Sequence, residues 1–143
     1  TEADRKAAAA LAVKLMEKTR PASGNAYLTR KGFPGHECVM LTAIHKTGGV
    51  TFRAGDMVVP LYDNAGALVN VQLINSDGLK RTLKGGAVKG ACHTIEGKKQ
   101  AGKRLWVAEG YATALTVHHL TGETVMVALS SVNLLSLASL ARQ

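Results

Sequence analysis

The sequence predicts a mixed α/β protein, α+β overall, with an N-terminal helix, an antiparallel β-meander and a final βαβα unit with parallel strands. Three observations support this prediction. An alanine-rich segment near the N-terminus has helical apolar spacing, the middle of the chain consists of short β-rich runs between turn residues, and the C-terminal part alternates strand and helix patterns. Such alternation favours parallel pairing. With 143 residues, 46% of them hydrophobic, the chain is long enough to bury a core.

The N-terminal helix is expected over residues 3–18, and Pro21 and Gly24 are expected to end it. Because Thr1 is not a natural initiator, we expect the chain to be an excised piece or a processed product. The predicted organisation is a helix and linker over residues 1–24, a β-rich basic part over 25–102 and a partial α/β domain over 103–143.

The β-rich part is predicted to contain strands at residues 38–44, 50–52, 57–62, 68–74, 79–83 and 91–95. Pro60 suggests an edge strand or a bulge. The turn Ser76-Asp77-Gly78 separates two of these strands, which predicts a hairpin. The segment 85–90, GGAVKG, has neither the ending of a nucleotide P-loop nor a following helix, so we do not assign it to that class.

The C-terminal part begins with an apolar run at residues 105–108, which predicts a buried strand. Gly110 lets the chain turn into a helix at about 112–120, which Gly122 caps. A second strand at 124–129 and a helix at 132–142, capped by Ser130 and Ser131, follow. Ligands of open α/β sheets bind beyond the carboxyl ends of the strands. Glu109 is therefore a candidate metal ligand or general acid/base, and the alternative is a solvated loop glutamate.

The net charge of +8 is concentrated in one segment. Residues 80–104 contain eight cationic side chains and one anionic side chain, Glu96, for a net charge of +7. The eight are Lys80, Arg81, Lys84, Lys89, Lys98, Lys99, Lys103 and Arg104. Clustered Lys and Arg indicate a phosphate-backbone binder, although a solvated basic surface is the alternative. Arg30 and Lys31 are further candidates that face water or nucleic acid.

The remaining patterns point to no other class of site. Cys38 and Cys92 are isolated, so we expect a reducing, cytoplasmic setting, with a single disulfide as the alternative. No apolar run is long enough for a membrane span, and no signal peptide is indicated. The pair His118-His119 is expected on the helix surface or at its C-terminal dipole. For Trp106 and Tyr27 we expect packing rather than stacking on single-stranded bases.

Several segments together resemble the Toprim domain of plasmid- and phage-encoded DNA primases, a group that includes TraC-like conjugative primases and primase-helicases. LWVAEGYATALTVH, at residues 105–118, resembles the first Toprim motif, and VMVALSSVNLLSLASL, at 125–140, resembles the second strand and its helix. Upstream, NAYLTRKGF at 25–33 and the segment 58–90 resemble corresponding segments of the same primases.

The resemblance implies that Glu109 is the Toprim glutamate of phosphodiester chemistry. The family's Asp-x-Asp motif, which binds magnesium, has no counterpart in this sequence. One carboxylate alone is a poor Mg²⁺ site. We therefore expect an N-terminal part of a primase Toprim region, or a degenerate version of one. Glu109 would supply a partial metal site, and Mg²⁺ would be bound in the complete parent protein.

The expected function is a region of a DNA primase, a nucleotidyltransferase that synthesises primers on single-stranded DNA. Its expected partners are single-stranded DNA, nucleoside triphosphates and a helicase or relaxase module of the same polypeptide. No interaction with a membrane is expected. The chain alone is expected to be inactive. The alternative is a non-catalytic DNA-binding or interaction module on the same scaffold, and a nuclease or topoisomerase piece is a third class.

Overall fold

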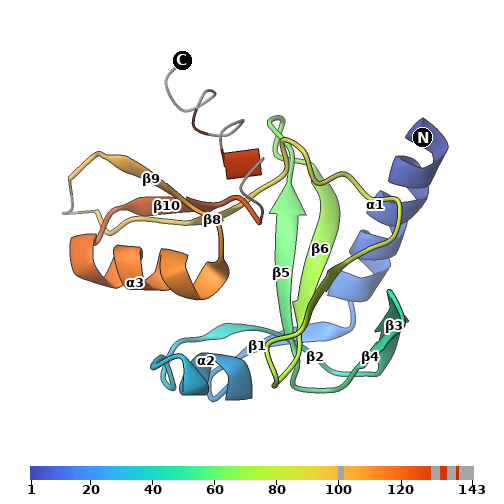
Figure 1. The fold of residues 1–143 in the computed structure, drawn as a ribbon, viewed down its shortest axis with the longest axis horizontal. Coiled ribbons are helices and arrows are strands. Elements are labelled where there is room, and N and C mark those ends of the chain that lie inside the picture. The colour runs from blue at the N-terminus through green and yellow to red at the C-terminus, as the bar shows by residue number, and fades with distance from the viewer. Residues whose placement is uncertain (100–101, 130–132, 135–137, 139–143) are drawn as a thin grey trace. The chain divides into compact units, whose positions relative to one another are not determined.

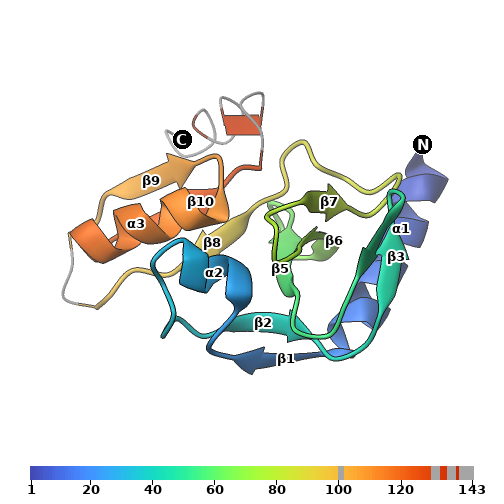
Figure 2. The same cartoon turned by 60° about the horizontal axis from the view of Figure 1, so that its bottom comes forward.

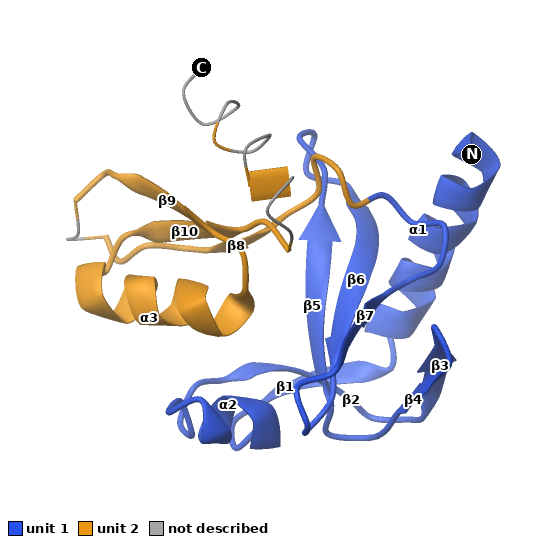
Figure 3. Ribbon diagram, viewed as in Figure 1, with its two compact units in different colours: residues 1–87 blue, residues 88–143 orange. Residues whose placement is uncertain are grey.

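The computed structural model describes residues 1–99, 102–129, 133–134 and 138. The chain divides into two compact units, residues 1–87 and 88–143 (Figure 3). An N-terminal helix, an antiparallel sheet and a later mixed sheet with parallel strands confirm the predicted fold class (Figure 1).

The first helix, α1 (Glu2–Met16), confirms the predicted N-terminal helix. It begins with a capping box, in which the Asp4 backbone N–H donates to the Thr1 hydroxyl at 3.2 Å. Alanines favour the helix, and Ala8, Ala12 and Leu15, spaced four and three residues apart, form its buried face. The helix therefore presents one apolar stripe of alanine and leucine to the sheet of its unit.

The main sheet of this unit has the strand order β1-β2-β5-β6-β7, and all neighbouring pairs are antiparallel. Its strands are β1 (Thr19–Ala22), β2 (Cys38–Leu41), β5 (Met57–Tyr62), β6 (Leu68–Ile74) and β7 (Lys80–Thr82). The predicted strands at 57–62 and 68–74 and the hairpin that follows are confirmed. β1 was not predicted, because Pro21 suggested a linker. It forms an edge strand, where a proline interrupts no ladder on its outer side.

Pro60 lies in β5, which has a neighbour on each side, so the expectation of an edge strand is wrong. The ladder between β5 and β2 consists of the pair Met40–Met57, and Pro60 lies beyond it. The missing N–H at Pro60 therefore removes no rung of that ladder. The alternative expectation was a bulge. The pairing of β5 with β6 does shift in register, but between Leu61 and Tyr62, just after Pro60.

Two smaller elements complete the first unit (Figure 2). The helix α2 (Ala26–Arg30) is capped by Asn25, whose Oδ1 accepts a hydrogen bond from the Leu28 backbone N–H at 3.0 Å. The hairpin of β3 (His45–Thr47) and β4 (Val50–Phe52) turns at two glycines with positive φ, Gly48 and Gly49. β4 was predicted, whereas the short polar strand β3 has no apolar pattern of its own and was not.

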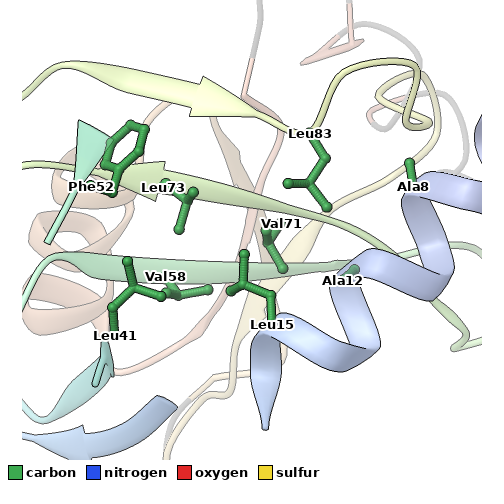
Figure 4. Packing of buried hydrophobic residues seen from close by; sticks show 9 residues of the cluster. All are labelled: Ala8, Ala12, Leu15, Leu41, Phe52, Val58, Val71, Leu73 and Leu83. Carbon is green, nitrogen blue, oxygen red and sulfur yellow. The ribbon is translucent and has the colours of Figure 1, made fainter. Parts of the chain in front are cut away.

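The core of the first unit lies between α1 and the sheet (Figure 4). Val71 and Leu73 of β6 are fully buried and alternate along the strand, as expected for one face of a sheet. Asn70, the residue before Val71 in β6, is also buried. Its Oδ1 accepts from the backbone N–H groups of Val71 at 2.8 Å and Leu83 at 3.1 Å, and its Nδ2 donates to the Ala87 carbonyl at 2.9 Å.

The second unit contains a mixed sheet with the order β8-β10-β9. Its elements are β8 (His93–Ile95), β9 (Leu105–Ala108), α3 (Tyr111–Thr121) and β10 (Thr124–Val127). β9 and β10 are parallel and α3 connects them, while β8 is antiparallel to β10. Gly122 caps α3 in the left-handed conformation with φ 71°, as predicted.

Residues 105–108 form the predicted strand, β9, but only Ala108 is buried, so the expectation that the whole strand is buried is wrong. β9 is an edge strand in which Leu105 is 43% exposed, whereas Val125 and Val127 of the central strand β10 are fully buried. Of the helix predicted at 132–142, Asn133, Leu134 and Ala138 are described, and they are helical. The proposed capping residues Ser130 and Ser131 lie outside the described residues.

Cys38 and Cys92 carry free thiols and belong to different units. Burial, together with the negative charge of Glu37, raises the pKa of Cys38 to about 11. Among the described helices, none has the length and apolar character that crossing a membrane requires.

Candidate functional site

Glu109 lies where the sequence placed it, directly after β9 at the carboxyl ends of the two parallel strands. The pairing continues past the strand ends. The Ala128 N–H donates to the Ala108 carbonyl at 2.7 Å, and the Leu129 N–H donates to the Glu109 carbonyl at 2.8 Å. This pairing holds the Glu109 backbone while its side chain is exposed. The carboxylate is therefore positioned by the sheet and accessible to a ligand.

The backbone next to Glu109 includes a strained residue. Leu129 has φ 71°, a conformation that residues with a side chain rarely adopt. Strain of this kind persists where the surrounding structure enforces it, and it is common at functional sites. Here it occurs at the residue that donates to the Glu109 carbonyl.

The N-terminus of α3 follows Glu109 immediately. Its N-cap, Gly110, makes no side-chain capping hydrogen bond. The first backbone N–H groups of a helix have no partner within the helix, and the helix dipole places partial positive charge there. This edge of the second unit thus combines one carboxylate with backbone donors that favour an anion.

The segment before β8 reaches the same edge, because β8 runs antiparallel to β10 and His93 is paired with Val127 at the strand end. Asn133, which is buried, ties this segment to the sheet. Its Oδ1 accepts from the Gly90 N–H at 2.8 Å, and its Nδ2 donates to the carbonyls of Ala91 at 2.9 Å and Ala128 at 2.7 Å. Lys89, one of the predicted phosphate-binding residues, is exposed and directly precedes this segment.

Asn133 was not among the predicted site residues. An asparagine in a leucine-rich helical segment gives no local sign that its amide will bridge two loops. Its partners, Gly90 and Ala128, become neighbours only when the sheet forms.

Lys103 and Arg104 lie at the opposite, amino end of β9. Arg104 is five residues before Glu109, roughly 16 Å away along an extended strand at about 3.3 Å per residue. Arg104 is also engaged by Glu123, with its Nη2 at 3.1 Å from the Glu123 Oε1, and its guanidinium lies 5.3 Å from the centre of the Trp106 ring. The structure therefore separates these two cations from the candidate carboxylate.

Glu123 was also not among the predicted site residues. Its side chain is buried, with 3% of its surface exposed. Burial alone would raise the pKa of Glu123, but hydrogen bonds from the backbone and guanidinium of Arg104 outweigh burial and lower it. The Trp106 indole N–H adds to this lowering of the pKa without reaching hydrogen-bonding geometry. Glu123 is thus an ionised, structural carboxylate.

In the first unit, three predicted phosphate-binding residues converge on Tyr27. The cationic groups of Arg30, Lys31 and Lys80 lie 5.9, 5.7 and 5.8 Å from the centre of its ring. Tyr27 is 3% exposed, which confirms the expectation of a packing role. The ring therefore supports a local cluster of positive charge, which we call the Tyr27 cluster, from the end of α2 and the start of β7.

The other predicted phosphate-binding residues differ in how far the fold engages them. The Arg81 guanidinium donates to the carbonyls of Gly48 at 3.3 Å and Lys80 at 2.8 Å. Lys84 is exposed in the first unit, and Lys98, Lys99 and Lys103 are exposed in the second.

The fit of Mg²⁺ to the described residues is partial. No group of three or more His, Cys, Asp or Glu side chains that could hold a metal ion occurs within residues 1–99, 102–129, 133–134 and 138. Mg²⁺ in phosphate chemistry is usually bound by one or two carboxylates together with phosphate oxygens and water. Glu109 fits as one such carboxylate.

The chain has a mixed α/β fold with an exposed carboxylate at the end of a parallel strand. In sequence, it is related to DNA primases. It is 33% identical over 114 residues to a DNA primase TraC of Escherichia coli, a match that covers 78% of this chain and 10% of the relative. A second DNA primase TraC of Escherichia coli is 33% identical over 96 residues, covering 65% of this chain and 7% of the relative.

The chain thus spans about a tenth or less of the length of these relatives. No family model matches the chain, and no solved structure matches it.

Proposed function

We propose that this chain is a region of a Toprim-type DNA primase of a mobile element, acting within a longer protein that synthesises primers on single-stranded DNA. The similarity to the DNA primases TraC is the observation on which the proposal depends. The exposed Glu109 at the carboxyl ends of β9 and β10 supports it, because this is the edge at which α/β sheets bind ligands.

In the proposed reaction, a primer 3′-hydroxyl attacks the α-phosphorus of a nucleoside triphosphate, an O–P bond forms and pyrophosphate leaves. Bound Mg²⁺ would neutralise charge on the phosphates. Glu109 either accepts the hydroxyl proton or contacts the metal. The N-terminus of α3, at the same edge, favours phosphate there.

Single-stranded DNA would be held by cations outside this edge as well. The Tyr27 cluster is the best-defined candidate, because three positive groups lie within 6 Å of one ring. Lysines and arginines that contact phosphates release counterions, so the affinity is expected to fall as salt rises. An affinity that does not depend on salt would contradict this electrostatic role.

Priming by the full-length parent protein tests the role of Glu109. We expect Glu109→Gln to lower the rate of primer synthesis by a factor on the order of 10² or more, as for loss of an acid/base group. Glu96→Gln, at another exposed glutamate of the same unit, is the matched control and should prime normally. Priming by Glu109→Gln at the wild-type rate would refute the assigned role.

A non-catalytic DNA-binding module is the second candidate, and it is favoured because the described residues contain no group of three or more His, Cys, Asp or Glu side chains that could hold a metal ion. A Mg²⁺ titration followed by NMR distinguishes the two. Shifts of the Glu109 and Leu129 amide signals at sub-millimolar Mg²⁺ would count against the non-catalytic module.

A further inference from the structure

A small pocket in the first unit opens beside α1, and the proposed function does not use it. Its volume is about 120 Å³. Leu11 and Leu15 of α1, Leu41 of β2, and Ala43 and Ile44 after β2 give it an apolar wall. An apolar cavity of about 150 Å³ accommodates benzene, so this pocket has room for one aliphatic side chain.

The wall is accessible from solvent. Ile44 is 61% exposed and Leu11 is 42% exposed, although both are large apolar residues. The wall is aliphatic, and the residues that line the pocket include no phenylalanine, tyrosine or tryptophan, the rings that serve as stacking platforms for nucleic-acid bases. Its chemistry therefore fits an aliphatic group rather than a nucleobase.

The polar side chains of the pocket are all basic: Lys14, Lys18 and His45. Within the part of the chain that the structure describes, neither lysine forms an ion pair. The Nε2 atom of His45 is buried and has no hydrogen-bond partner. Because buried polar atoms are nearly always hydrogen-bonded, an unpartnered one calls for an explanation. A bound ligand that accepts or donates a hydrogen bond at this nitrogen would supply the missing partner.

We propose that this pocket binds an acidic peptide segment of a partner protein, which presents a bulky aliphatic side chain next to a carboxylate. The aliphatic side chain occupies the apolar wall. The carboxylate lies between the two lysine ammonium groups and accepts a hydrogen bond from His45 Nε2, which a rotation of the imidazole ring exposes to the pocket. The match of charge and of apolar surface at one small site sets this partner apart from the phosphate backbone of DNA.

The proposal has a pH signature. Burial, and then the nearby Lys18, lower the pKa of His45 in the free protein. The charged groups that line the pocket with His45 are Lys14 and Lys18 near α1, and the partner of His45 in the hairpin, Phe52, is uncharged. A bound carboxylate would raise the pKa of His45, so binding takes up a proton. Aspartate side chains with a pKa near 3.9 stay ionised throughout this range. Affinity should therefore increase as the pH falls from about 8 to about 6.

The test uses the whole 143-residue chain and a capped five-residue peptide in which aspartate alternates with leucine, beginning and ending with aspartate. Binding is measured by isothermal titration calorimetry, without DNA, so its outcome is independent of the proposed function. Replacing leucine by alanine, or aspartate by asparagine, should each weaken binding by about tenfold or more. An absence of binding at millimolar peptide, or equal binding of the asparagine peptide, would overturn the proposal.

Protein variants locate the site. Lys14 and Lys18 are exposed, so Lys14→Gln with Lys18→Gln should leave the fold intact, as checked by circular dichroism, and should weaken peptide binding by about tenfold or more. Lys6→Gln, on the same helix and outside the pocket, is the control and should bind normally. His45→Gln should abolish the pH dependence. A double lysine variant that binds as tightly as Lys6→Gln would refute this location.

Discussion

The Glu123 carboxylate is held by Arg104 through two groups at once. The Arg104 backbone N–H donates to Oε2 at 2.7 Å, and its Nε donates to Oε1 at 3.1 Å. The two residues join the end of the α3–β10 connection to the start of β9. The Arg104 side chain, which the charge pattern assigned to DNA, is therefore engaged by a buried carboxylate of its own unit.

This ion pair predicts an acid-sensitive stability. The pKa of Glu123 is below its ordinary value of 4.5 in the folded chain, so its stabilising effect is complete above about pH 4.5 and is lost as the pH falls through the lowered pKa. Glu123→Gln should lower the melting temperature at pH 7 by a few degrees, and the difference should shrink towards pH 3. Fluorescence of Trp106, the one tryptophan of the chain, reports unfolding of this unit.

The exposed Glu96→Gln is the matched control and should melt like the wild type at both pH values. A difference for Glu123→Gln of the same size at pH 7 and pH 3 would show that its charge is unimportant.

The Tyr27 cluster predicts a measurable share of DNA binding. Each phosphate contact to single-stranded DNA contributes about 0.7 to the slope of log K against log salt. Replacing Lys31 and Lys80 by alanine should therefore reduce the magnitude of that slope by roughly 1.4. Fluorescence anisotropy with labelled oligonucleotides at several salt concentrations measures it.

Lys6→Ala combined with Lys46→Ala removes the same charge from exposed positions outside the predicted binding set. This control should leave the slope nearly unchanged. If both double variants reduce the slope equally, net charge rather than the Tyr27 cluster determines binding.

Asn70 is predicted to be a key polar residue in the first unit. Asn70→Ala leaves the Leu83 N–H and the Ala87 carbonyl without their partner in a buried setting, at about 1–3 kcal/mol for each unsatisfied group. We expect the free energy of unfolding to fall by about 3 kcal/mol in urea denaturation. Asn64→Ala, in an exposed turn, should change it by less than about 0.5 kcal/mol. Equal effects of the two substitutions would contradict the importance of the network.

The thiol of Cys38 is predicted to be unreactive. With a pKa of about 11, its thiolate fraction at pH 8 is on the order of one in a thousand. Alkylation by iodoacetamide, followed by mass spectrometry, should be slow at pH 8 and should accelerate as the pH approaches 10. Urea-unfolded protein serves as the reference and should react much faster. Labelling of the folded chain at the unfolded rate would contradict the burial of this thiol.

Much of the local structure was predictable because its causes are local. Alternating apolar residues in β6 and the αL glycine that ends α3 act within a few residues, and both were identified correctly. β1 and β3 were missed for the opposite reason. Their residues show no strand pattern, and they extend because a neighbouring strand supplies partners.

For the candidate site, the sequence alone determined where Glu109 falls, since a strand followed by glutamate and glycine can be recognised locally. Only the tertiary structure decided which groups share its edge. Where β8 pairs with β10, the buried Asn133 joins Gly90, the residue after Lys89, to Ala128, and Arg104 is bound by Glu123 at the other end of β9. Such partners are far apart in the chain, and the closing of a sheet, rather than any local pattern, brings them together.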